Sequence, residues 1–233
     1  MNTHTRLHAN SIAGYYGKIP LAGDFVTRRI PHSTISVWDN WLRQGLYEAK
    51  NTFSPDSSAR FSHLTVWNFV IPPAICGEML IGMIGASSDR VGRQFPFTLF
   101  APPHTDRQMQ LDCITPFFMR HGPIVRALQL RQLGLEQLEQ SLAAASDWQL
   151  AASPSSATPS INGDIFSVLD DDEITITPSG GLLPWPGLSL AEIIIGNTSY
   201  WWTNQAAGGP LRAFTHTGGL NEPLFRILFF HDD

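Results

Sequence analysis

Residues 64–103 read LTVWNFVIPPAICGEMLIGMIGASSDRVGRQFPFTLFAPP, and this stretch decides the fold. It contains three apolar runs separated by a proline pair and a polar turn, at residues 64–71, 77–87 and 95–101. β-Branched and aromatic residues dominate the first and third runs, as is typical of strands. The middle run is almost continuously apolar, which indicates a central strand covered on both faces. Because no segment of helical length separates the runs, they predict neighbouring antiparallel strands rather than βαβ units.

Upstream of this stretch, residues 13–19 (AGYYGKI) predict a short strand, and a helix is predicted to begin at Ser33 or Thr34, either of which can cap it. Its apolar stripe is Val37, Trp38, Trp41, Leu42, Leu46 and Ala49, and its polar face is Asp39, Asn40, Arg43, Gln44 and Lys50. We expect the two tryptophans of this stripe to anchor the helix against the sheet.

Downstream, the apolar period becomes helical between residues 116 and 145, which predicts two helices that are separated near Gly134. The first stripe is interrupted at Gly122-Pro123, where that helix can begin. Residues 152–160 (ASPSSATPS) have the composition of a mobile linker. The remaining predictions are strands at 174–177, 198–203 and 211–216, a short helix at 188–195, and a helix or strand at 220–229.

The length of 233 residues allows one large domain or two small ones. We expect a polar, disordered lead over residues 1–12 and a single domain over 13–233. The net charge of −5 argues against nucleic acid, since phosphate backbones demand a concentrated basic face. The longest apolar run, residues 79–86, is far shorter than the about 20 residues of a membrane span. The first residues also lack the apolar core of a signal peptide, so we expect a cytoplasmic protein without membrane insertion.

No catalytic or metal-binding constellation stands out, and we expect no cofactor. His4 and His8 stand four residues apart, but they have no third ligand. The acidic run 170–173 (DDDE) lacks the spaced carboxylates and glycine of a calcium loop, which favours a solvated turn. Cys76 and Cys113 are interpreted as buried reduced thiols, with a single disulfide left open. Cys76 as a nucleophile would need a paired base that the sequence does not place.

Charged residues gather in two loops rich in glycine and proline, residues 17–31 (GKIPLAGDFVTRRIP) and 89–96 (DRVGRQFP). These loops contain Lys18, Asp24, Arg28, Arg29, Asp89, Arg90 and Arg93. The clustering is informative because the chain is only 15% charged, against about a quarter in typical domains.

A structural interpretation is that Asp24 and Asp89 accept hydrogen bonds from loop amides or pair with a neighbouring arginine. A functional interpretation is a rigid polar surface for a protein or phospho-group partner, which a fixed arginine fork suits. The first is favoured for the two aspartates, and both stay open for the arginines. In Ser199-Tyr200-Trp201-Trp202, only a strand covered on both faces buries both tryptophans, and otherwise Trp201 is a candidate interface anchor.

The motifs GYYGKIPLAGDFVTRRIP, WDNWL, WNFVIPPAICG and SSDRVGRQFPFTL occur in this order over residues 14–103. Together they resemble the TagF family of type VI secretion-associated proteins, also called ImpM, and SYWW fits the family's late Trp-Trp element. The resemblance implies a three-layer α/β/α sandwich around a mixed, largely antiparallel sheet.

The resemblance also implies a cytoplasmic regulatory protein of a type VI secretion system. Members of this family are understood as post-translational repressors that engage the forkhead-associated scaffold protein of the apparatus. The residues that this implies as motif or partner contacts are Lys18, Asp24, Arg28, Asp89, Arg90, Arg93 and Trp201. Among them, Asp24 and Asp89 are the residues most readily explained by a structural role, whereas Arg90 and Arg93 are the preferred partner contacts.

Two alternatives to a regulatory binding protein stay open. One is a hydrolase with an unrecognised active site, which would require an enclosed pocket with a base beside a hydroxyl or thiol. The other is a structural component of the secretion apparatus, which would be stably present in the assembled machine. The sequence does not define the oligomeric state, nor whether binding requires a phosphorylated partner.

Overall fold

The described strands form one seven-stranded sheet in the order β2-β1-β5-β4-β3-β6-β7, and every pairing in it is antiparallel. The computed structural model describes residues 12–52, 61, 65–103, 110–147, 184–185 and 187–230. The strands are β1 (Gly14–Gly17), β2 (Val26–Arg28), β3 (Val66–Ile71), β4 (Leu80–Gly85), β5 (Phe97–Phe100), β6 (Thr198–Thr203) and β7 (Ala213–Thr217). The parallel pairs of the expected mixed sheet therefore do not occur among these strands.

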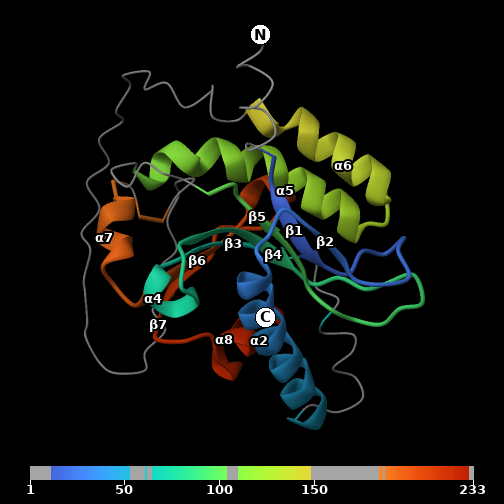
Figure 1. The fold of residues 1–233 in the computed structure, drawn as a ribbon, viewed down its shortest axis with the longest axis horizontal. Helices are drawn as coiled ribbons and strands as arrows, with labels where there is room; N and C mark the ends of the chain where they lie inside the picture. The colour runs from blue at the N-terminus through green and yellow to red at the C-terminus, as the bar shows by residue number, and fades with distance from the viewer. Residues whose placement is uncertain are drawn as a thin grey trace.

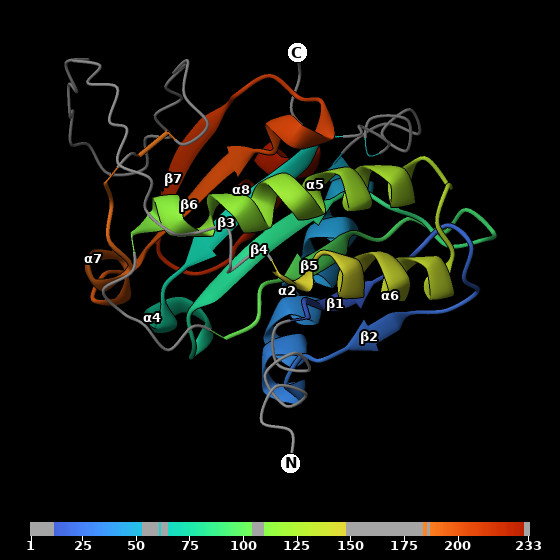
Figure 2. The ribbon, with the colours of Figure 1, turned by 90° about the horizontal axis from the view of Figure 1, so that it is seen from above.

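Helices cover both faces of the sheet, which confirms the three-layer α/β/α sandwich (Figure 1). The helices are α2 (His32–Thr52), α4 (Pro73–Cys76), α5 (Thr115–Gln129), α6 (Leu135–Ala144), α7 (Leu190–Ile194) and α8 (Glu222–Phe229), with short 3-10 helices at Leu111–Ile114 and Gln205–Ala207. In Figure 2, α5 and α6 lie on the viewer's side of the sheet and α2 on the far side. Each of the two helical layers packs on the sheet through its own apolar core.

The centre of the sheet is the predicted meander of β3, β4 and β5. All residues of β3 and β4 are buried, because a helical layer packs on each face of these strands. The same covering buries both tryptophans of β6. Trp201 packs in the layer of α2 and α8, and Trp202 packs in the layer of α5. Trp201 is 0% exposed and Trp202 1%, so β6 is the strand covered on both faces, and Trp201 is a core residue rather than the interface anchor proposed for an exposed tryptophan.

Helix α2 confirms most of its predicted apolar stripe. Trp38, Trp41 and Leu42 are buried against the sheet, and the Trp38 indole donates to the Thr98 hydroxyl at 2.8 Å. Val37, however, is 44% exposed, so its place in the stripe is wrong. Successive helix residues point about 100° apart, and Val37 falls beside the stripe that its neighbour Trp38 occupies.

Helix α5 runs through Gly122 and Pro123, so the prediction that the helix begins there is wrong. It begins at Thr115, with a proline in its first turn. The glycine has a packing role instead, because a Cβ on Gly122 would lie 2.2 Å from the Asn204 carboxamide oxygen. That carboxamide bridges the Asn68 side chain and the Phe118 carbonyl, and it thereby ties β6 to β3 and α5.

The last third of the chain is described from residue 184 with one gap at 186, and there the predictions of a short helix and two strands are confirmed by α7, β6 and β7. The segment 220–229, ambiguous in the sequence, is helix α8, capped by the Asn221 side chain. The predicted linker at 152–160, the acidic run at 170–173, the strand at 174–177 and the lead up to residue 11 lie outside the described residues.

His121 of α5 is a buried imidazole that faces the apolar core of its layer. Its Nδ1 lies 2.9 Å from the Phe117 carbonyl oxygen, while Nε2 has no hydrogen-bond partner among the described residues. Burial lowers the pKa of His121 to about 4, against the opposing effect of the hydrogen bond to Phe117. The imidazole is therefore neutral in the folded protein at pH 7.

The neutral state of His121 predicts a loss of stability as the pH falls. The unfolded chain binds a proton there near pH 6.5 and the folded chain only near pH 4, so protons favour unfolding between these values. From pH 7 to pH 5 we expect His121 to reduce the free energy of unfolding by on the order of 2 kcal/mol. Urea unfolding at both pH values should show this loss in the wild type and in His32→Gln, whose histidine is exposed. It should be absent in His121→Leu, and an equal loss in that variant would contradict the account.

Candidate functional site

The two charged loops of the sequence meet at one end of the sheet. Gly17, the last residue of β1, pairs with Phe97, the first residue of β5, so the loop after β1 adjoins the loop before β5. Gly17 has φ 137°, and a Cβ there would lie 2.2 Å from the Pro96 carbonyl oxygen. Only glycine allows this close approach. We call the group formed by Lys18, Gly23, Asp24, Asp89, Arg90 and Arg93 the charged corner.

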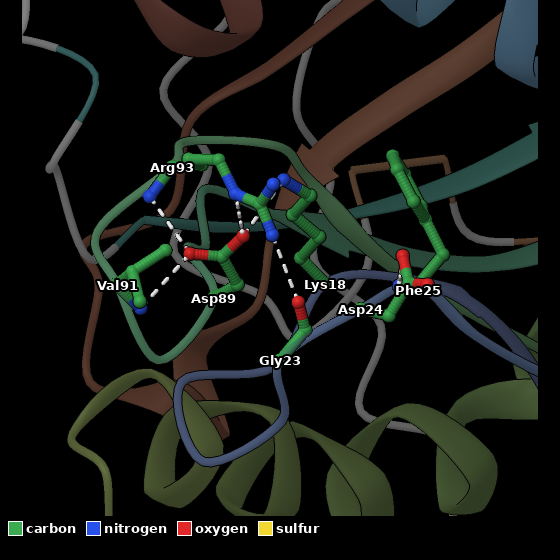
Figure 3. Close-up of polar contacts among 7 residues, drawn as sticks. All are labelled: Lys18, Gly23, Asp24, Phe25, Asp89, Val91 and Arg93. Carbon is green, nitrogen blue, oxygen red and sulfur yellow. Dashed lines mark hydrogen bonds and ion pairs between the residues drawn. The ribbon is translucent and has the colours of Figure 1, made fainter.

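The Asp89 carboxylate is the centre of the charged corner and is 0% exposed. One oxygen accepts from Lys18 Nζ at 2.9 Å and from Arg93 Nε at 2.6 Å (Figure 3). The other accepts from the backbone N–H groups of Val91 and Arg93, at 3.1 and 2.9 Å. Both oxygens are thus saturated with donors, two of which are cationic.

The hydrogen bonds to Asp89 also decide its charge. Burial alone would raise the pKa of this carboxyl, but the bonds from Lys18 and from the backbone and side chain of Arg93 outweigh it. They hold the pKa of Asp89 well below its usual range. Asp89 is therefore ionised at any pH at which the protein is used, and it is not available as a proton donor.

Further bonds join the two loops directly. Arg93 donates from a terminal guanidinium nitrogen to the Gly23 carbonyl at 2.8 Å, and the Arg90 amide donates to the Ala22 carbonyl at 2.8 Å. The Asp89 amide closes its own loop by donating to the Arg93 carbonyl at 3.1 Å. These bonds give Asp89 the structural role of holding the two loops together. Lys18 shares this role through its ammonium, and Arg93 shares it through its backbone and its guanidinium.

Asp24 does not join the Asp89 network. It is exposed, and its carboxylate accepts only a local hydrogen bond, from the Phe25 amide at 2.8 Å (Figure 3). Arg28 lies outside the charged corner, and its Nε is 3.5 Å from a Glu139 oxygen of α6. Arg29 makes two shorter contacts to the same carboxylate, at 3.0 and 3.2 Å. These arginines fasten the end of β2 to α6.

Arg90 differs from the other cations of the charged corner. Arg90 is exposed, and its guanidinium has no hydrogen bond or ion pair with any residue that the structure describes. Its neighbour Val91 is 70% exposed. The backbone on both sides is fixed by the bonds to Ala22 and Asp89, so the turn presents Arg90 outward from a rigid base. Of the two arginines preferred as contacts, Arg90 matches a contact better than Arg93 does.

A cleft of about 980 Å³ borders the charged corner on the side of α2. Its lining consists of Lys18, Phe25, Arg43, Leu46, Tyr47, Lys50, Gly92, Arg93, Gln94 and Phe95. Arg43 and Lys50 are on the predicted polar face of this helix, and no site was predicted for them. The available signal was the outward spacing of Arg43, Tyr47 and Lys50, which puts two cations around an aromatic ring.

The cysteines and the metal-ligating side chains bear on the hydrolase alternative. The described residues contain no group of three or more His, Cys, Asp or Glu side chains that could hold a metal ion. Cys76 and Cys113 are free and half-buried, so neither is the fully buried thiol that was expected. Burial, with the nearby Glu78 carboxylate, raises the pKa of the Cys76 thiol to about 12, which is the opposite of what a nucleophile needs. None of the described helices combines the length and the apolar character that crossing a bilayer requires.

These features define the class of the protein as a three-layer α/β/α sandwich with a hydrogen-bonded charged corner at one end of its antiparallel sheet. Residues 14–145 match the model of the TagF N-terminal domain, described as type VI secretion system-associated. The match includes the entire charged corner and spans more than half of the chain. The chain belongs to the TagF family.

A solved structure supports the fold. The crystal structure of PA0076 from Pseudomonas aeruginosa PAO1 superposes with a TM-score of 0.61, over 95% of this chain and 96% of that one. The sequence identity is 23%, so this likeness bears on the fold alone. Among curated proteins no match was found.

Proposed function

We propose that this chain is a cytoplasmic, post-translational repressor of a type VI secretion system. It acts by binding the forkhead-associated scaffold protein of that apparatus, and it performs no catalysis of its own. Membership of the TagF family places the chain among secretion-associated proteins, and the repressor role and the identity of the partner are the steps that we propose beyond it.

The observation that carries the proposal is the outward presentation of Arg90 from a rigid charged corner. The corner uses a buried lysine, a buried carboxylate and a second arginine to fix one loop, and this loop leaves Arg90 exposed without a partner among the described residues. The backbone that carries Arg90 is already fixed, so binding does not have to order this loop, and the guanidinium has five N–H donors to offer to a partner.

Co-purification tests the proposal. The tagged chain, expressed in a bacterium that has the secretion system, should retain the forkhead-associated scaffold protein at low salt, and excess chain should reduce secretion by that system. Retention should weaken at higher salt because a surface arginine contact is screened. The absence of a complex at low salt, or secretion that is unaffected by excess chain, would count against the proposal. A complex present at fixed stoichiometry in the assembled apparatus would favour a structural component instead.

A further inference from the structure

The lining of the cleft between α2 and the charged corner contains cationic side chains and no acidic residue. Three of its four cations are already ion-paired, Lys18 and Arg93 with Asp89 and Arg43 with Asp39. Lys50 is the cation of the lining that has no ion-pair partner among the described residues. The chain as a whole carries a net charge of −5. A cationic cleft on an acidic protein concentrates the attraction for anions in one place. The charge of the lining therefore indicates an anionic occupant.

Aromatic rings lie between these cations. The Arg43 guanidinium lies 5.2 Å from the centre of the Phe25 ring and 5.9 Å from that of Phe95, and Lys18 Nζ lies 5.1 Å from the centre of Phe25. Tyr47 is 68% exposed at the rim. The exposed ring of Tyr47 gains free energy when apolar groups cover it. The occupant should therefore carry apolar side chains as well as negative charge.

The arrangement of the cations fits several separate carboxylates better than one phosphate. The Nε of Arg93 already donates to Asp89, and the Nε of Arg43 donates to Asp39 at 2.6 Å, so each arginine has only its terminal Nη groups left for a ligand. Arg43 and Lys50 are two helical turns apart, about 10 Å along α2. A peptide in the polyproline II conformation has three residues per turn, so its side chains at i and i+3 lie on one face, about 9 Å apart.

We propose that this cleft binds an acidic segment of a protein partner, with carboxylates about three residues apart and apolar side chains between them. Lys50 is the principal free contact, since it is exposed and no residue that the structure describes pairs with its ammonium. The inference rests on the proposed function only for the identity of the protein that supplies this segment. The recognition chemistry comes from the lining of the cleft.

A fluorescence anisotropy titration with a defined probe tests the inference. The probe is a labelled peptide of about 12 residues with glutamate at every third position and phenylalanine or serine between them. A second peptide replaces each glutamate by glutamine. We expect the acidic peptide to bind at least about tenfold more tightly than the glutamine peptide at low salt, and the difference to shrink as salt is added. Equal binding of the two peptides, or binding of neither, would overturn the inference.

Variants of α2 locate the binding. Lys50→Glu should weaken the acidic peptide at least about fivefold, and Arg43→Gln with Lys50→Gln about tenfold or more. The matched control is Arg120→Glu, on the opposite side of the sheet, which should bind as the wild type does. Unchanged binding in Lys50→Glu, whose lysine supports no described contact, would show that the peptide binds elsewhere.

Two further ligands exclude other anions. A peptide with one phosphothreonine and no glutamate, and vesicles containing phosphatidylserine, should both bind more weakly than the acidic peptide, and preferential binding of either would overturn the assignment. The same variants are then tested against the forkhead-associated scaffold. If the peptide binds the cleft but the scaffold is not captured, the proposed function fails and this inference stands. If the scaffold binds all variants equally and the peptide does not bind, the inference fails and the proposed function stands.

Discussion

Replacement of Asp89 by alanine is expected to lower the melting temperature by at least about 5 °C, more than any other single charge substitution in the charged corner. The Asp89 carboxylate is completely buried and accepts four hydrogen bonds, two from the cationic groups of Lys18 and Arg93. Without it, the Lys18 ammonium, which is 9% exposed in its side chain, has lost its acceptor. An unpaired buried charge is strongly destabilising.

A double variant separates loss of the ion pair from loss of packing. In Asp89→Asn, Lys18 keeps its charge without a charged partner, and adding Lys18→Met removes that charge. We expect the double variant to recover part of the lost melting temperature in a thermal scan. Asp24→Asn is the matched control, since Asp24 is exposed and accepts only one local bond, and it should melt as the wild type does. Equal effects of Asp24→Asn and Asp89→Asn would refute this account of the charged corner.

The same carboxylate contributes a pH dependence of known sign. Because the pKa of Asp89 is held below its usual range in the folded chain, its contribution is complete above the ordinary aspartate pKa of about 4. The contribution is lost as the pH falls from there towards the lower folded pKa. This loss lies below the window of His121, so the free energy of unfolding should fall over two successive ranges of pH, first through His121 and then through Asp89.

Replacement of Trp38 by alanine is expected to cost about 3–5 kcal/mol in the free energy of unfolding. The Trp38 indole is 1% exposed and packs against the rings of Phe69 and Phe100, with centroids 5.1 and 5.3 Å away. The substitution opens a cavity between α2 and the sheet, and it also removes the donor to Thr98. Urea denaturation of the purified variant measures the cost.

The neighbouring residue supplies the control for Trp38. Val37 lies on the same helix but is 44% exposed, so Val37→Ala should change the free energy of unfolding by less than about 0.5 kcal/mol. Trp38→Phe keeps most of the apolar volume and should fall between the two alanine variants. If Val37→Ala cost as much as Trp38→Ala, the assignment of the buried face of α2 would be wrong.

The elements predicted correctly were those with a local signal. The strands β3 and β5 show dense β-branched and aromatic composition, and Trp38 and Trp41 show helical spacing. The errors arose where tertiary packing overrides local preference. Gly122 and Pro123 look like a helix boundary, yet the glycine serves contact with Asn204, which is far away in the sequence. Residues 220–229 did carry a helical signal that the prediction left undecided, since Asn221 caps the segment and its buried Leu224, Phe225, Leu228 and Phe229 recur at helical spacing.

The site shows the same division. The concentration of charge in two loops was visible in the sequence, and so was the choice of Asp89 as a structural residue. Its pairing with Lys18 was not, because these residues are 71 positions apart and meet only through the pairing of β1 with β5. The pairing of Arg29 with Glu139 is separated by 110 positions. The cleft beside α2 likewise exists only after the loop at Gly92 packs next to the helix.

The central claim is that Asp89 builds the charged corner and that Arg90 contacts the forkhead-associated scaffold from it. Calorimetric titration of the purified scaffold with the purified chain tests this most directly, with Arg90→Glu as the variant. The account predicts a complex at low salt, an affinity at least about tenfold weaker for Arg90→Glu, and an unchanged melting temperature in that variant. No heat of binding at low salt, or equal affinity of Arg90→Glu and the wild type, would contradict it.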